Sequence, residues 1–168
     1  VSGGKVTAAV LFYNLASETP GLLTQYDIVV FDEAQTISFD NPGEVVGILK
    51  DYLESGRYTR GKQKATADAS VVLLANIPLD SAGEPSQTVL FYNLPAFLSE
   101  TAFIDRLHGI LPGWKLPRVT VHTPAKGIGF KADFFSEVLH ALRDRGGYAE
   151  YVSAHLHVAG TEDILDKK

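Results

Sequence analysis

The sequence contains neither cysteine nor methionine. Without cysteine, the chain can form no disulfide and no thiolate metal site. It also has no apolar run near the roughly 20 residues that a membrane-spanning helix needs. No basic segment leads into an apolar one, as it would in a secretory signal peptide. We therefore expect a cytoplasmic protein that makes no membrane contact.

An excess of positive charge is absent as well. The 168 residues carry a formal net charge of −5, so the chain as a whole is not a polyanion binder. Any nucleic-acid contact must come from a local basic patch. Apolar residues make up 45% of the chain and charged residues 21%, as in an ordinary globular protein. This length accommodates one domain, or one domain and part of another.

A phosphate-binding loop is missing too. Ser2-Gly3-Gly4-Lys5 is similar to the end of the pattern G-x-x-x-x-G-K-[ST]. However, Val6 stands where Ser or Thr would bind Mg²⁺, and no upstream glycine or strand completes the pattern. Because the chain also begins with valine, we expect it to be a piece of a longer protein.

Apolar spacing predicts an alternation of helices and strands. Helices are expected at residues 7–15, 44–55, 101–107 and about 129–145. Unbroken apolar runs predict buried strands at 26–31 and 70–75, with further strands at 89–92 and 109–114. The segment 57–66 is interpreted as a protruding hairpin or loop. This alternation predicts a layered α/β domain with a mostly parallel sheet.

The first apolar run ends in two adjacent carboxylates, Asp32 and Glu33. Active sites of parallel sheets lie at the carboxyl ends of the strands. In a P-loop ATPase this is the Walker B element: the aspartate helps to hold Mg²⁺, and the glutamate can polarise the attacking water. The alternative is a strand that merely ends at a solvated Asp-Glu pair.

Two more polar residues follow in the order that an AAA+ ATPase needs. Asn76 ends the second predicted strand, where a side-chain amide can orient the attacking water. Arg106 lies on a short predicted helix, from which a guanidinium can reach the γ-phosphate of a neighbouring subunit. Alternatively, Asn76 caps a strand end, and Arg106 pairs with Asp105 or Glu100 on a surface helix.

Four cations lie within eight residues of the predicted hairpin, with Tyr58 among them: Arg57, Arg60, Lys62 and Lys64. An exposed hairpin of this composition suits phosphate contact or base stacking. The alternative is a solvated loop.

Eight short blocks of sequence are distinctive in combination. In order along residues 2–145 they are Ser2–Thr7, Leu11–Asn14, Val30–Glu33, Leu49–Gly56, Thr59–Lys62, Ala75–Ile77, Phe103–His108 and Leu111–Trp114. This combination resembles the Lon-like AAA+ protein of the BREX phage-defence systems, a family often described as Lon-related ATP-dependent proteases. The resemblance assigns Walker B to Asp32 and Glu33, the sensor 1 role to Asn76 and the arginine finger to Arg106.

The resemblance also implies a ring-forming, DNA-engaging motor that uses ATP and Mg²⁺. Residues 1–120 would be a partial AAA+ P-loop NTPase core, from Walker B to the strand after the arginine finger. Residues 121–168 would begin the helical lid. The family's P-loop strand would lie upstream, between the sensor 1 strand and the strand after the arginine finger. Without it we expect a sheet of three to five strands with a gap or a rearranged order.

Two other functions stay open. The chain can be a non-catalytic nucleic-acid-binding module that uses the basic hairpin 57–64. It can also belong to an ATP-dependent peptidase. No nucleophile–base pair is visible in this sequence to support that function, so the protease domain would lie outside this chain. Whether the substrate is DNA or protein is not decided by these patterns.

Overall fold

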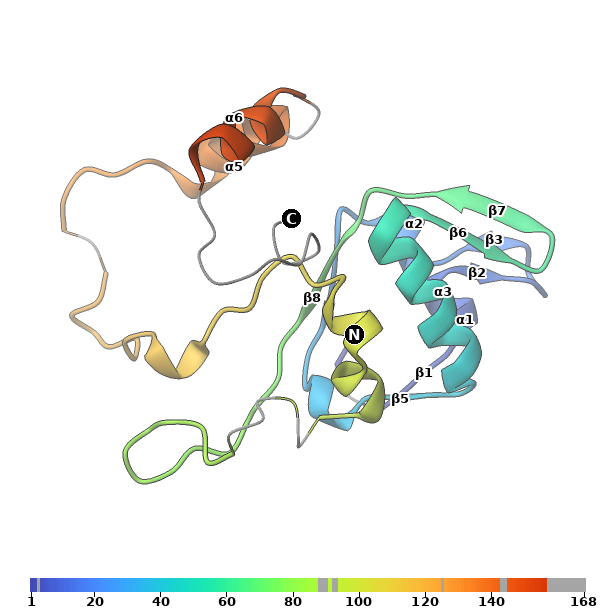
Figure 1. The fold of residues 1–168 in the computed structure, drawn as a ribbon, viewed down its shortest axis with the longest axis horizontal. Coiled ribbons are helices and arrows are strands. Elements are labelled where there is room, and N and C mark those ends of the chain that lie inside the picture. Colours follow the sequence, from blue (N-terminus) through green and yellow to red (C-terminus); the bar gives the residue numbers. More distant parts are fainter. Residues whose placement is uncertain (3, 88–90, 92–93, 125, 143–144, 157–168) are drawn as a thin grey trace. The chain divides into compact units, whose positions relative to one another are not determined.

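The computed structural model describes residues 1–2, 4–87, 91, 94–124, 126–142 and 145–156, without the side chains of Ala149 and Ser153. The chain divides into two compact units, Val1–Lys115 and Leu116–Lys168. Both helices and strands are present, so the predicted mixed α/β class is confirmed. Figure 1 shows the ribbon of the chain.

The centre of the first unit is a parallel pair of strands, β4 (Ile28–Phe31) and β8 (Ser70–Leu73). Ile28 pairs with Ser70, and Phe31 pairs with Leu73. Val29 and Phe31 are buried because alternate residues of a strand point to the same face. Both strands and their parallel pairing were predicted, but their predicted burial is only partly correct. Ile28 of β4 is 59% exposed, and Ser70 and Val72 of β8 are exposed too.

The N-terminal segment runs beside the end of β4. Asp32 N donates to Val1 O at 2.8 Å, and Ser2 bridges Asp32 in the parallel sense. Further along, β1 (Lys5–Val6) pairs in parallel with β5 (Ser38–Phe39).

The strands of the described residues form four two-stranded sheets, and not the predicted sheet of three to five strands. The single bridge at Ser2 links the N-terminal segment to the end of β4, but it is too short to add a strand to the β4–β8 pair. Two of the four pairs are parallel and two are antiparallel, so the described strands do not form the mostly parallel sheet that was predicted.

The predicted helix at residues 7–15 is wrong beyond its first turn. Helix α1 covers Ala8–Leu11, and the chain then forms the antiparallel pair β2 (Tyr13–Asn14) and β3 (Thr19–Pro20). Tertiary contact explains the early end, because Gly21 N donates to Phe12 O at 2.7 Å. A Cβ atom at Gly21 would lie 2.5 Å from the Leu11 carbonyl carbon, so only glycine permits this approach.

The longest helix of the unit is α3 (Pro42–Ser55), which extends the predicted helix 44–55 by two residues at its start. Asn41 caps it by accepting from Glu44 N, and Gly56 ends it in the left-handed conformation (φ 68°). Its buried face packs into a single apolar core with α1 and α2 (Leu22–Gln25). The largest fully buried side chains of this core are Phe12, Phe31, Phe103, Leu11, Leu23, Leu49, Leu98 and Val45.

The predicted hairpin is present as β6 (Arg57–Arg60) and β7 (Gln63–Thr66), an antiparallel pair that turns at Gly61. Figure 1 shows it extending from the end of α3. Tyr58 attaches it to the core: the ring packs against Phe12 at 5.2 Å between centroids, and the hydroxyl donates to Phe12 O at 2.8 Å.

After β8 the unit is mostly irregular. A 3-10 helix η2 (Ala96–Ser99) leads into α4 (Thr101–Ile104), which is shorter than the predicted helix 101–107. The predicted strand 109–114 is wrong: its first residues are irregular, and Gly113–Lys115 form the 3-10 helix η3. No described strand pairs with this segment, so no ladder of hydrogen bonds holds its backbone in an extended conformation. The predicted strand 89–92 lies almost wholly outside the described residues.

The second unit contains α5 (Ala132–Leu142) and α6 (Tyr148–His155). Helix α5 falls within the predicted helix 129–145, whereas α6 was not predicted. Gly147 precedes α6 with φ 98°, a left-handed conformation that glycine adopts without strain. Across the described part of the chain, no helix has the length and apolar character needed to cross a membrane.

The buried Tyr58 hydroxyl makes the free energy of unfolding depend on pH in the alkaline range. Burial raises the pKa of Tyr58, and a hydrogen bond with the Thr24 side chain offsets part of this rise. The folded state therefore favours neutral Tyr58. Its contribution to the free energy of unfolding is complete below the ordinary tyrosine pKa of about 10 and is lost as pH rises through the higher pKa of the folded state.

We predict that Tyr58→Phe removes this alkaline component. At neutral pH it lowers the free energy of unfolding by about 1 kcal/mol, because Phe12 O loses a buried donor. Urea unfolding from about pH 8 to pH 11 measures both effects. The control Tyr26→Phe alters a side chain that is 58% exposed and leaves both quantities unchanged. An alkaline loss in Tyr58→Phe equal to that of the wild type contradicts the prediction.

Candidate functional site

The carboxyl ends of β4 and β8 lie at one edge of their sheet, and backbone hydrogen bonds continue the pairing beyond the strands. Leu74 N donates to Phe31 O at 2.9 Å, and Ala34 N donates to Leu74 O at 2.8 Å. Asp32 and Asn76 follow these two ends, and both residues are exposed. The register of the strands therefore fixes the backbone positions of both residues at this edge.

A cavity of about 710 Å³ opens beside β8 and contains three of the residues singled out from the sequence, Asp32, Asn76 and Arg106. One wall is residues 71–77, and the opposite part of the lining comes from residues 106–111 with Trp114. The cavity is largely apolar. Trp114 Nε1 is buried and has no hydrogen-bond partner in the described structure.

Glu33 is not among the residues that line this cavity. Its backbone is left-handed (φ 54°, ψ 46°), which turns the chain sharply out of β4 and into the 3-10 helix η1 (Ala34–Thr36). Its backbone N–H donates to Asp32 Oδ1 at 2.9 Å. A residue with a Cβ atom adopts this conformation at a cost of about 1 kcal/mol, which the surrounding structure must offset.

Sequence reasoning missed Gln35, which connects the two strand ends. Its side-chain Oε1 accepts a hydrogen bond from Asn76 N at 3.1 Å. No spacing rule links residues that are 41 positions apart, so this contact becomes visible only once the strands are paired.

Arg106 is held by groups of its own unit. Its Nε donates to Lys50 O at 3.1 Å, Nη1 donates to Ala102 O, and Nη2 pairs with the Glu54 carboxylate. Neither Asp105 nor Glu100, the partners considered from the sequence, is its partner: Glu100 pairs instead with Lys50. The Glu54 side chain is 64% exposed, so the ion pair contributes less than about 1 kcal/mol, and the two carbonyl contacts matter more.

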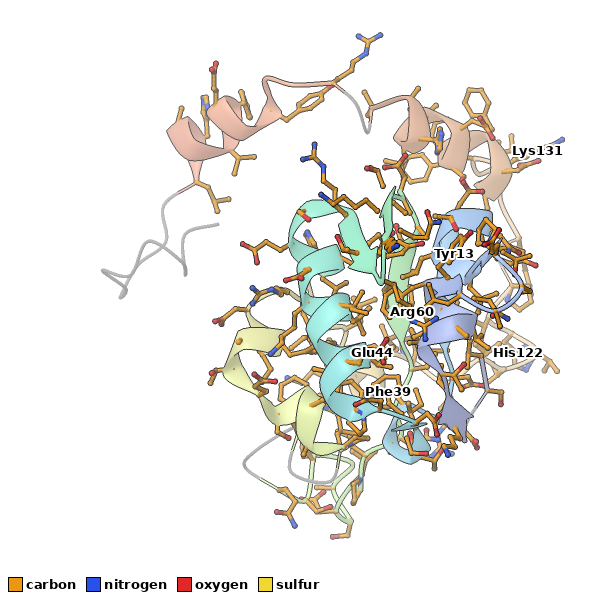
Figure 2. All side chains as sticks on the ribbon, turned by 90° about the vertical axis from the view of Figure 1, so that its right-hand side faces the viewer. Tyr13, Phe39, Glu44, Arg60, His122 and Lys131 are labelled. Carbon is orange, nitrogen blue, oxygen red and sulfur yellow. The ribbon has the colours of Figure 1, made fainter. Side chains whose placement is uncertain are left out.

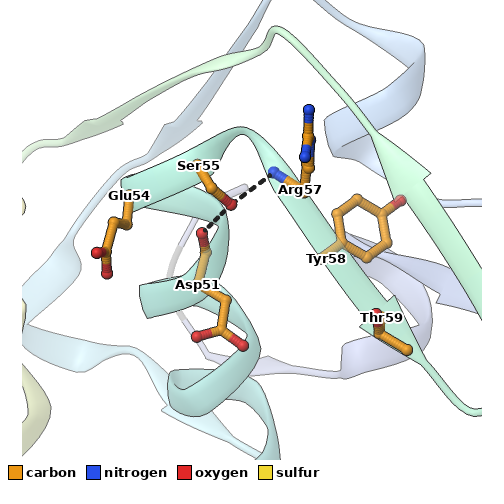
Figure 3. A pocket seen from close by; sticks show the side chains of 6 residues that line it. All are labelled: Asp51, Glu54, Ser55, Arg57, Tyr58 and Thr59. Atoms are coloured by element: carbon orange, nitrogen blue, oxygen red, sulfur yellow. Dashed lines mark hydrogen bonds between the residues drawn. The ribbon is translucent and has the colours of Figure 1, made fainter.

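A second, smaller cavity of about 320 Å³ lies at the junction of α3 and β6 (Figure 3). Ser55 organises this junction, because its Oγ donates to Asp51 O and accepts from Arg57 N. The cavity is open and lined by both acidic and basic side chains. It fixes the start of the hairpin and brings none of the catalytic candidates together.

The four hairpin cations are not equivalent. Arg57, Lys62 and Lys64 are exposed, whereas Arg60 is half-buried. Arg60 Nε pairs with Glu44 Oε1 at 3.1 Å, and its Nη1 donates to Tyr13 O. Figure 2 shows Arg60 beside both partners. Arg60 therefore anchors the hairpin to α3 and β2.

Arg57 and Lys64 share the outer face of the hairpin. Arg57 lies opposite Thr66, and Lys64 lies opposite Thr59, while Tyr58 points to the core from the other face. Lys62 lies in the turn between β6 and β7, beside Gly61. The exposed cations thus form one strip along the hairpin.

The described residues contain no group of three or more His, Cys, Asp or Glu side chains that would hold a metal ion by protein ligands alone. The cavity offers one carboxylate, Asp32, and one amide, Asn76. This donor set fits Mg²⁺, which needs only one or two carboxylates and completes its shell with water and phosphate oxygens.

The comparisons with known proteins show the family of the chain. The profile of the family described as "Lon-like protease BrxL-like, ATPase domain" matches residues 1–168. The chain is thus an ATPase-type domain by family, and it belongs to the BrxL-like family.

Two relatives carry the name Lon-like protease BrxL. The protein of Escherichia coli O9:H4 (strain HS) is 38% identical over 146 residues, and that of Bacillus cereus (strain H3081.97) is 38% identical over 147 residues. Each match covers 86% of this chain and 21% of the relative. The chain therefore spans about a fifth of the length of these relatives.

The backbone of Glu33 leads to a prediction about stability. Glu33→Gly relieves a left-handed strain of about 1–2 kcal/mol but adds unfolded-chain entropy that costs about 0.4–1 kcal/mol. The free energy of unfolding, measured by urea unfolding, therefore rises by less than about 1 kcal/mol. Glu18 has the same φ of 54° outside the cavity lining, so Glu18→Gly is the matched control and gives a similar gain. Destabilisation by Glu33→Gly alone would show that the carboxylate itself stabilises the fold.

Proposed function

We propose that this chain supplies the hydrolytic half of the ATPase site of a longer BrxL-like protein, in which ATP hydrolysis drives action on DNA or protein within a ring. The observation that carries the proposal is the cavity of about 710 Å³ whose lining includes Asp32 and Asn76. These two residues come from segments far apart in the sequence. Membership of an ATPase-domain family supports the same function.

Each residue has a role that follows from its chemistry. Asp32 would help to hold Mg²⁺ through water, and the ion would neutralise charge on the phosphates of ATP. Glu33 acts as the base that polarises the attacking water. The Asn76 side-chain amide has no partner in the described structure, so it is free to orient that water.

The exposure of Glu33 fits its role as a base. Its carboxylate follows the buried strand β4 directly, and it has no cationic partner among the described ion pairs. No ion pair therefore has to break before this carboxylate contacts a water molecule.

Arg106 acts on the nucleotide of a neighbouring subunit in this proposal. Its guanidinium holds two backbone carbonyls and Glu54, and it remains 26% exposed. Engagement of a phosphate therefore requires exchange of the exposed Glu54 contact. The two carbonyl contacts can continue to hold the Nε side of the guanidinium.

A phosphate cradle is the part that this chain does not supply. Strand β8 is paired on one edge only within the described residues, and the cavity lies beside it. The unpaired Trp114 Nε1 also belongs to that cavity lining. These features support the proposal that a P-loop strand from another part of the protein enters between β8 and residues 107–111.

The proposal predicts no ATP hydrolysis by the 168-residue chain and steady hydrolysis by a protein that continues upstream through a G-x-x-x-x-G-K-[ST] segment. In that longer protein, Glu33→Gln lowers kcat by at least about 100-fold and leaves ATP binding intact, because the base is lost and the phosphate contacts are kept. Phosphate release and nucleotide binding measure the two effects.

The matched control is Glu18→Gln, because Glu18 is an exposed glutamate outside the cavity lining. Turnover by the isolated chain that is abolished by Glu33→Gln contradicts the division of the site. Unchanged turnover in the longer protein with Glu33→Gln contradicts the role of Glu33.

The exposed strip of hairpin cations supports a second function, contact with a nucleic-acid backbone. Arg57, Lys62 and Lys64 are exposed on β6–β7, although the whole chain is acidic. Arg60 holds the hairpin through Glu44 and Tyr13 O, so the strip has a fixed base. A fixed strip of cations can contact successive phosphates of one strand.

We predict that DNA binding by the longer protein weakens when Lys62 and Lys64 are both changed to Ala. The slope of log affinity against log salt falls by about 1 for each phosphate contact that is lost. Fluorescence anisotropy with single-stranded and duplex DNA measures both quantities. Arg118→Ala removes one exposed cation from the second unit and is the control; an equal loss in that variant shows that net charge, and not the hairpin, determines binding.

A further inference from the structure

Gln35 links the two chain segments that follow β4 and β8. It is the middle residue of η1, the 3-10 helix that directly follows Asp32 and Glu33, and its side chain is half-buried. Its Oε1 accepts from Asn76 N at 3.1 Å. Because a backbone N–H only donates, the carbonyl oxygen of the side chain must be the atom that faces it.

This contact continues the β4–β8 pairing after the backbone of β4 has left the sheet. Backbone bonds join the two segments as far as Ala34 N and Leu74 O. The chain then coils into η1, and no backbone carbonyl accepts from Asn76 N among the described residues. The Gln35 side chain takes the place that the next strand carbonyl would occupy in a longer ladder.

The Thr36 end of η1 is bonded to the backbone carbonyl of Glu33. Glu33 O accepts from Thr36 N at 2.8 Å and from Thr36 Oγ1 at 3.0 Å. The turn is therefore closed on both sides of Gln35. A displacement of η1 must move the backbone of Glu33 and, through Gln35, the backbone of Asn76.

We propose that Gln35 is a positioning residue that holds the Asn76 backbone in register with Asp32 and Glu33. The inference rests on the proposed function and extends it by naming the residue that joins the two halves of the water-activating group. Gln35 does not touch the reacting atoms. It acts because a water-orienting amide must be held within about 0.5 Å of its working position.

Amide hydrogen exchange of the 168-residue chain, followed by NMR, tests the contact. The Asn76 amide is expected to exchange at least about tenfold more slowly than an unprotected amide. Gln35→Glu keeps an acceptor of the same length and keeps the protection, whereas Gln35→Leu removes the acceptor and loses it. Protection of Val72 in β8 is expected to stay unchanged in both variants.

Gln63→Leu is the matched control, because Gln63 is an exposed glutamine of β7 on the distant hairpin. This variant leaves the Asn76 amide protected. An unprotected Asn76 amide in the wild type overturns the proposal without any variant. Protection that survives Gln35→Leu overturns it as well.

Turnover in the longer protein tests the functional consequence. Gln35→Leu is expected to lower kcat by about tenfold and to keep the KM for ATP within twofold of the wild-type value, because positioning acts on the transition state. Gln35→Glu keeps the acceptor, so its kcat is expected to match that of the wild type. Asn76→Ala is measured beside them. If Asn76→Ala leaves kcat unchanged, the proposed function fails at Asn76; if Asn76→Ala lowers kcat and Gln35→Leu does not, the positioning role alone fails.

Discussion

The parallel pairing of β4 with β8 is the constraint on which the rest of the site depends. Four residue pairs set the register, from Ile28–Ser70 to Phe31–Leu73. Because parallel strands end at the same edge, this register brings Asp32 and Asn76 to one side of the sheet. A slip of one residue would turn the buried Val29 and Phe31 to the other face, so the apolar core enforces the arrangement of the site.

Charged side chains stabilise the supports around this edge. Arg60 fixes the hairpin through Glu44, and Arg106 fixes the end of α4 to α3 through Lys50 O and Glu54. A guanidinium carries five donors in a planar fork, so one arginine can hold a backbone carbonyl and a carboxylate at once. The same property lets Arg106 serve both the fold and, in our proposal, a neighbouring nucleotide.

The strong local patterns of the sequence predicted what local physics decides. The strand before Asp32, the helix α3 and the hairpin at Arg57 were all found near their expected residues. Contacts between distant segments decided the rest: Gly21 ends α1 early, and Gln35 reaches Asn76 across the sheet. The assignment of Asp32, Glu33, Asn76 and Arg106 to one site is still a prediction, because an arrangement in space does not by itself test a chemical role.

The most direct test of the account is a cryo-EM structure of the longer protein with Mg²⁺ and a non-hydrolysable ATP analogue. We predict a parallel strand paired with the free edge of β8, with the γ-phosphate close to Glu33 and Asn76 and the metal close to Asp32. The cavity between β8 and residues 107–111 would then be filled. A β8 edge that stays unpaired, with the nucleotide bound elsewhere, would contradict the claim that these residues form the hydrolytic half of the site.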